Sequence, residues 1–133
     1  MKLINHLQDS QLKQLPFFET GHTVRVHQKV IDLITDPKTG KVTGKKERAQ
    51  VFEGLVIAKK NGKGITGTFI VRKISSGVGV ERIFPLHSNN IVKLEVVKTP
   101  DVRTSKIYYV RDRQDNTPRF KKSKQMKKTE RLN

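Results

Sequence analysis

The sequence predicts a mainly β fold, a small antiparallel barrel with a short N-terminal helix and a basic C-terminal extension. Its 133 residues are 34% hydrophobic, which is enough for one small core but not for two. From Gly21 onward, apolar residues recur at every second position in five or six short runs, divided by Gly and Asn turns. No gap between these runs has the dozen-residue helical pattern that a crossover between parallel strands needs. The sheet is therefore expected to be antiparallel.

The N-terminal segment differs from the rest in its hydrophobic period. Apolar residues at positions 3, 4, 7, 12 and 15 follow a spacing near 3.6, with polar residues between them. This pattern predicts an amphipathic helix over residues 1–15. The helix should end before Pro16, because a residue that precedes proline avoids helical backbone angles.

The first two strands are expected over residues 24–30 and 50–59. Val24, Val26 and Val30 alternate with basic side chains, which predicts an apolar inner face and a basic outer face. The second run is almost entirely apolar and is expected to be central. The intervening segment, 33–46, is predicted to be an extended hairpin tip, and its Asp-Pro-Lys-Thr-Gly sequence is predicted to form the turn. It is open at this point whether the tip is a mobile loop, an extension of both strands or a tolerated surface insertion.

The next two strands are expected over residues 68–75 and 80–86, joined by the glycine-rich turn 76–79. Alternation should direct Phe69, Val71, Ile83 and Val80 toward the core or its rim, and Arg72 and Arg82 outward.

Two further strands are expected, over residues 92–96 and 107–110. In the last one, Tyr108 and Tyr109 should point to opposite faces, one into the core and the other available to stack on a base or ribose. Ordinary packing of both rings is the alternative.

The charge of the chain points to a polyanionic partner. Lys and Arg number 28 against 12 Asp and Glu, a formal net charge of +16 at pH 7. Residues 114–133 form a basic tail that repels itself unless a polyanion or water surrounds it. Nucleic acid is the favoured partner, and membrane surfaces or acidic proteins are the alternatives. Lys outnumbers Arg, which favours phosphate contacts over the reading of base edges.

Several other functional classes are disfavoured by the same sequence. The absence of Cys excludes disulfides and thiolate metal sites, and the four His residues lack metal-ligand spacing. The pattern GxGxxG at 62–67 precedes a strand-like run rather than the helix that a dinucleotide site requires. The longest apolar run has four residues, whereas a membrane span needs about 20. We expect a soluble protein that has no cofactor and is not an enzyme.

The segment 71–88, VRKISSGVGVERIFPLHS, is distinctive enough to suggest a family. With 50–57, 21–26 and the run 106–111, it resembles the bacterial large-subunit ribosomal protein L19 family. The resemblance implies an SH3-like barrel over residues 16–113 and a cytoplasmic protein that binds large-subunit ribosomal RNA. It also implies a place at the intersubunit face, bridges through small-subunit ribosomal RNA, and ribosomal proteins L3 and L14 as neighbours.

We expect the RNA contacts to come from cations that flank the strands and fill the tail. These candidates are Arg25, Arg72, Lys73, Arg82, His87, Arg103, Lys106, Arg111, Arg113, Arg119, Lys121, Lys122, Lys124, Lys127 and Lys128. His87 has a local hydrogen-bonding role in a turn as its alternative. For the whole protein, the alternatives are a basic DNA- or transcript-associated binding module with the same barrel and an RNA-acting enzyme.

Overall fold

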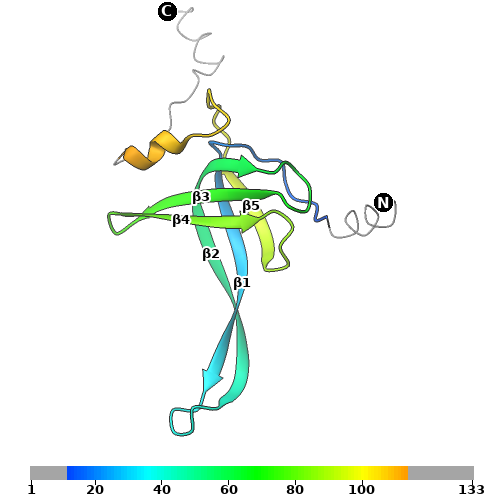
Figure 1. The fold of residues 1–133 in the computed structure, drawn as a ribbon, viewed down its shortest axis with the longest axis vertical. Helices are drawn as coiled ribbons and strands as arrows, with labels where there is room; N and C mark the ends of the chain where they lie inside the picture. Colours follow the sequence, from blue (N-terminus) through cyan, green and yellow to red (C-terminus); the bar gives the residue numbers. More distant parts are fainter. Residues whose placement is uncertain (1–11, 114–133) are drawn as a thin grey trace, which may run out of the picture.

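The computed structural model describes residues 12–113, which form five strands and one short helix (Figure 1). The strands are β1 (Thr23–Thr35), β2 (Val42–Lys60), β3 (Thr68–Ser75), β4 (Val78–Pro85) and β5 (Ile91–Lys98), and η1 (Tyr108–Asp112) is a 3-10 helix. The expected mainly β fold is confirmed. The predicted basic tail lies outside the described residues, as does most of the predicted N-terminal helix.

The strands form a single antiparallel sheet in the order β4-β3-β2-β1-β5. The apolar run at 50–59 lies in β2, the central strand, as predicted. Within residues 12–113, no ladder joins the edge strands β4 and β5. The sheet is therefore open, and its predicted closure into a barrel is not confirmed.

The first core lies on one face of this sheet. Val24 and Val26 of β1 are fully buried there, which confirms their predicted inward direction. Both edge strands contribute, since Phe84 of β4 and Leu94 of β5 belong to the same cluster. The Phe69 ring stacks on Phe84 with 5.5 Å between ring centroids. Because residues from both edges share one cluster, the sheet must curl around it. Each large apolar side chain that is fully buried contributes about 1.5–3 kcal/mol.

A second core covers the opposite face of the central strands. Ile57 of β2 and Ile70 of β3 pack there against Ile107 and Val110, from the segment that follows β5. The Ile107 amide donates to the Ile57 carbonyl oxygen at 2.9 Å, which fastens this segment to β2. The neighbours Phe69 and Ile70 are both buried because they point into different cores.

The predicted strand at 107–110 is wrong, because this segment leads into η1. Ile107 and Val110 both enter the second core, and a 3-10 helix aligns residues three apart on one side. Tyr108 and Tyr109 are both half-buried against this core rather than divided between core and solvent. The alternative of ordinary packing for both rings is therefore confirmed, and the division of the two rings between core and solvent is wrong.

The described end of the predicted N-terminal helix is not helical. Residues 12–18 carry no regular secondary structure, so the prediction is wrong for 12–15, and 1–11 lie outside the described residues. Tertiary contacts replace the helical ones here. The Lys13 amide donates to Nδ1 of His87, and Leu15 packs against the first core.

The β3–β4 hairpin has the predicted turn but a different phase in its second strand. Ser76 and Gly77 both have positive φ, 52° and 77°, as a two-residue type I′ turn requires. Ile83 is 65% exposed and Phe84 is buried, so the expectation that Ile83 faces the core is wrong. Phe84 pairs with the core residue Phe69, and this register puts Ile83 on the other face.

The segment 33–46 extends both strands, which was one of its three predicted alternatives. β1 continues to Thr35 and β2 starts at Val42, with Asp32 paired to Lys46 and Leu33 to Lys45. The result is a two-stranded arm that projects from the body of the sheet (Figure 1).

Candidate nucleic-acid interface

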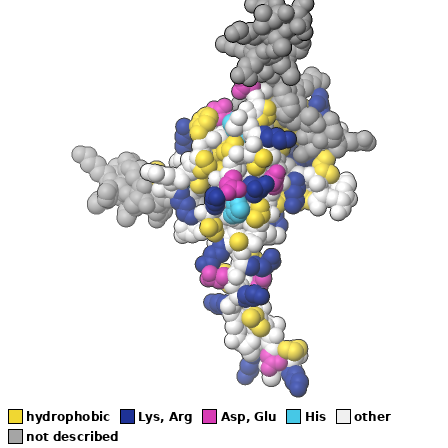
Figure 2. All heavy atoms as spheres, turned by 180° about the vertical axis from the view of Figure 1, so that it is seen from behind, with side chains coloured by type: hydrophobic (Ala, Val, Ile, Leu, Met, Phe, Trp, Pro, Cys, Tyr) yellow, Lys and Arg dark blue, Asp and Glu magenta, His cyan; other side chains and the backbone are white. Residues whose placement is uncertain are grey.

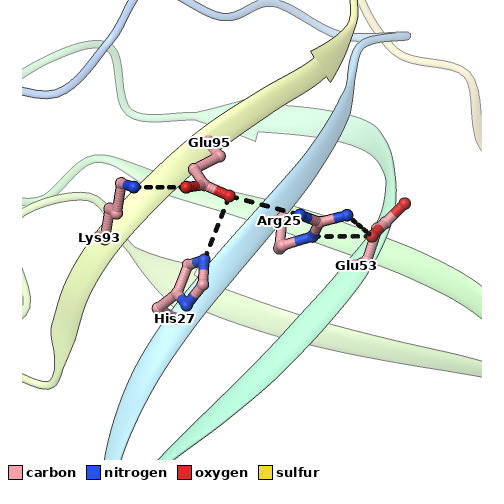
Figure 3. A network of polar contacts seen from close by, with 5 residues as sticks. All are labelled: Arg25, His27, Glu53, Lys93 and Glu95. Atoms are coloured by element: carbon pink, nitrogen blue, oxygen red, sulfur yellow. Dashed lines mark hydrogen bonds and ion pairs between the residues drawn. The ribbon is translucent and has the colours of Figure 1, made fainter.

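The outer face of β1, β2 and β5 carries a network of five polar side chains (Figure 3). Arg25 contacts Glu53 at 2.8 Å and Glu95 at 3.5 Å. Glu95 also lies 3.3 Å from His27 and 2.5 Å from Lys93. The hydrogen bonds from Lys93 and His27 lower the pKa of Glu95 to about 2. Arg25, a predicted RNA-binding residue, is therefore largely neutralised within the protein.

A second network connects the β3–β4 hairpin to η1 through Glu81. Its carboxylate accepts hydrogen bonds from Arg72 at 2.8 Å and from two nitrogens of Arg111 at 2.8 and 2.9 Å. Burial alone raises the pKa of Glu81, but the hydrogen bonds from Arg111 and Arg72 outweigh it and lower the pKa. The Arg72 side chain is only 13% exposed, so the expectation that it reaches outward is wrong.

Lys73 and Arg82 lie together on the face of the hairpin that carries the first core. The Lys73 Nζ is 4.6 Å and the Arg82 guanidinium carbon 5.0 Å from the centre of the Phe52 ring. Arg82 also donates to the Gln50 side chain at 3.4 Å. Among the residues that the structure describes, neither has a carboxylate within salt-bridge distance. Both are half-buried, and within residues 12–113 their charge faces the ring of Phe52 rather than a carboxylate.

His87 holds two distant segments together. Its Nδ1 accepts the Lys13 amide at 2.9 Å, and its Nε2 lies 2.9 Å from the Lys63 carbonyl oxygen. This arrangement fits the neutral ring with its proton on Nε2. Both ring nitrogens are engaged, which is the local hydrogen-bonding alternative considered for this residue.

The remaining predicted cations of the described range surround η1 and the segment before it. Arg103 and Lys106 are exposed, and neither has an ion pair within the described part of the chain. Arg111 lies 4.8 Å over the Tyr108 ring and Arg113 lies 5.3 Å over the Tyr109 ring. The predicted tail candidates lie outside the described residues: Arg119, Lys121, Lys122, Lys124, Lys127 and Lys128.

Sequence reasoning missed a group of lysines at the end of β2. Lys59 donates to the Phe18 carbonyl oxygen at 2.9 Å and lies over the Phe18 ring. Burial, and then the nearby Lys63, lower the pKa of Lys59. Lys59 and Lys63 line a hollow of about 510 Å³ together with the exposed ring of Phe17. The signal was present in the cluster of lysines at 59, 60 and 63 beside the glycine-rich loop.

Residues 12–113 contain neither a metal-ligand cluster nor a membrane-spanning helix. Within this range, no three His, Cys, Asp or Glu side chains are grouped as a metal ion would require. The same residues contain no helix long and apolar enough to cross a bilayer.

The sequence comparison identifies the family. Residues 2–123 match the family model described as Ribosomal protein L19. The chain belongs to the ribosomal protein L19 family. Membership makes it a structural ribosomal protein of the large subunit, and the resemblance seen in the sequence is confirmed. The match covers all of the described residues of this L19 family member, including the β3–β4 hairpin whose sequence suggested the family.

Proposed function

We propose that this L19 family member binds large-subunit ribosomal RNA through phosphate contacts, as a non-enzymatic constituent of the cytoplasmic ribosome. We further propose that it lies at the intersubunit face and contributes to bridges with small-subunit ribosomal RNA. Ribosomal proteins L3 and L14 are its proposed neighbours, and an SH3-like barrel remains the proposed full architecture. Family membership supports each of these statements, because each is a property of the family that the sequence resembles.

One observation carries the RNA-binding part of the proposal. The cations divide into those neutralised inside the protein and those without a carboxylate partner in the described range. Arg25, Arg72 and Arg111 belong to the first group. Outside the segment 33–46, the second group includes Lys60, Lys63, Lys73, Arg82, Lys98, Arg103 and Lys106. Cations without internal partners gain most from a polyanion, because each phosphate contact releases condensed counterions from the RNA.

We therefore assign different roles to the predicted site residues. Arg103 and Lys106 are proposed to contact phosphates, and so are Lys73 and Arg82 of the hairpin. Arg113 and the basic tail extend this contact, as the sequence suggested. Arg25, Arg72 and Arg111 serve mainly to hold the fold together, since their charges are already paired with carboxylates.

The salt dependence of RNA binding tests this proposal. If the protein neutralises about 6–10 phosphates, its affinity for large-subunit ribosomal RNA should fall by about 10³–10⁵ between 50 and 200 mM salt. The double variant Arg103→Gln, Lys106→Gln should show a slope of log affinity against log salt that is smaller in magnitude by about 1.5.

A matched control removes two cations that carboxylates already neutralise, Lys29→Gln with Lys93→Gln. This variant should keep the original salt slope. An affinity of the unmodified chain that does not change with salt would contradict the proposal. Equal slopes for the two double variants would contradict the assignment of roles.

A further inference from the structure

The arm consists of residues 29–49, and it stands apart from the rest of the sheet. β1 pairs with β5 only as far as Gln28, and β2 pairs with β3 only from Leu55 onward. Apart from the Lys29 amide, which donates to the Asn90 carbonyl oxygen at 2.7 Å, residues 29–35 and 42–49 make backbone pairs within residues 12–113 only with each other. No arm residue belongs to either core cluster of the described residues. At a rise of about 3.3 Å per residue, the strand from Lys29 to Thr35 extends about 20 Å from the body of the sheet.

Charge is divided unevenly along the arm. Near the body, Lys29 contacts Glu47 at 2.8 Å and Arg48 contacts Asp32 at 2.5 Å, so this half is neutral. The arm tip, residues 33–46, contains Asp36 as its one acidic residue. Its four lysines are Lys38, Lys41, Lys45 and Lys46. None of these lysine side chains has an ion pair among residues 12–113, so the tip carries a net charge of +3.

The arm tip also exposes aliphatic side chains beside its lysines. Leu33 is 57% exposed, Ile34 50% and Val42 54%. Figure 2 shows Lys and Arg side chains along the arm as far as its tip, with hydrophobic side chains exposed near the tip. A two-stranded hairpin without a core is only marginally stable in water. A surface that combines cations with exposed methyl groups is therefore suited to a partner that offers both phosphates and apolar edges.

We propose that the arm tip is a second RNA-binding element, which contacts a segment of ribosomal RNA separate from the one held by the body. The lysines contact phosphates, and Leu33 and Val42, which the strand register puts on one face of the ribbon, lie against riboses in the wide, shallow minor groove of an A-form helix. Protein interfaces are depleted in lysine, and four lysines without counter-ions would require a matching acidic patch on a protein partner. The charge therefore favours RNA. This inference rests on the proposed RNA-binding function.

A tip from which all four lysines have been removed tests the inference. The tip variant carries Lys38→Gln, Lys41→Gln, Lys45→Gln and Lys46→Gln. Its control carries four substitutions in the neutral half of the arm: Lys29→Gln, Glu47→Gln, Asp32→Asn and Arg48→Gln. Hydroxyl-radical cleavage of large-subunit ribosomal RNA with each full-length protein maps the protected backbone. The tip variant should lose one patch of protection and keep the others, with a salt slope lower by about 3. The control should keep every patch.

A shortened arm provides a second, independent variant. Asp32 pairs directly with Lys46, so residues 33–45 can be replaced by Asn-Gly in a two-residue turn. Because the arm belongs to neither core, this protein should melt within a few degrees of the original while losing the same patch of protection.

The outcomes separate this inference from the function on which it rests. If the unmodified chain and its variants all fail to protect the RNA backbone from cleavage, both the proposed function and the inference are overturned. If the tip variant and the shortened protein protect every patch that the unmodified chain protects, only the inference is overturned. If protection is unchanged and the tip also cross-links to a neighbouring protein, the arm binds a protein partner instead of RNA.

Discussion

At the scale of single residues, the availability of a cation depends on partners that are distant in the sequence. Arg25 and Arg103 are equally plausible phosphate ligands when only the sequence is known. In the structure, Arg25 contacts Glu53, which is 28 residues further along the chain, and Arg103 has no such partner within residues 12–113. Alternation correctly predicted that Arg25 faces outward, but pairing with Glu53 depends on the register between β1 and β2. The role of each cation could therefore not be predicted from the sequence.

Glu95 gives this network a defined pH dependence. Hydrogen bonds from Lys93 and His27 lower its pKa from 4.5 to about 2 in the folded protein. A carboxyl group with a depressed folded pKa stabilises the fold above its unfolded pKa and loses that contribution as the pH falls through the folded value. We expect urea midpoints to fall between pH 4.5 and 2, and to fall less steeply in Glu95→Gln. Profiles of equal steepness for the two proteins would contradict this assignment.

At the scale of elements, η1 is attached to the sheet by a carboxylate as well as by its apolar residues. Glu81 of β4 accepts hydrogen bonds from Arg111 of η1 and from Arg72 of β3. Its substitution by Gln keeps the shape of the side chain but removes the charge that both guanidinium groups share. We expect Glu81→Gln to lower the free energy of unfolding by about 1–2 kcal/mol, since hydrogen bonds to charged groups are worth more than neutral ones.

A matched substitution in the arm controls for the loss of a negative charge. Glu47 pairs with Lys29 in an exposed position, so Glu47→Gln should cost at most about 0.5 kcal/mol. Urea unfolding followed by circular dichroism measures both variants, and hydrogen exchange at the Val110 amide reports on η1 directly. Equal losses in the two variants would show that Glu81 does not hold η1 in place.

The elements differ in how far their sequences determine them. β3 was predicted over residues 68–75 and has these bounds, because its β-branched run lies between a glycine-rich loop and a Ser-Gly turn. The phase of β4 was wrong, since Ile83 and Phe84 are adjacent apolar residues and either could face the core. The segment at 107–110 has the composition of a strand. It becomes η1 because Ile107 and Val110 are both needed in the second core.

At the scale of the whole molecule, the sequence predicted a small, mainly β protein with a strong positive charge. It could not predict the second core, because that core forms only when the segment after β5 returns across β2 and β3. It also left open whether 33–46 continues both strands, since the lysines and threonines of this segment suit a loop as well as a ribbon.

The two proposed contacts follow from this architecture. Around the curled sheet, the body offers cations that have no carboxylate partner within residues 12–113, and the arm carries four more lysines about 20 Å away. One compact protein of this kind can connect two segments of RNA, which is consistent with a structural role in the ribosome.

Sedimentation of a cell lysate through a sucrose gradient tests the central claim most directly. The chain should sediment with large ribosomal subunits and with whole ribosomes, and it should stay with the large subunit when low magnesium separates the two. Recovery of the chain with the nucleoid, or at the top of the gradient while large subunits sediment normally, would contradict the account.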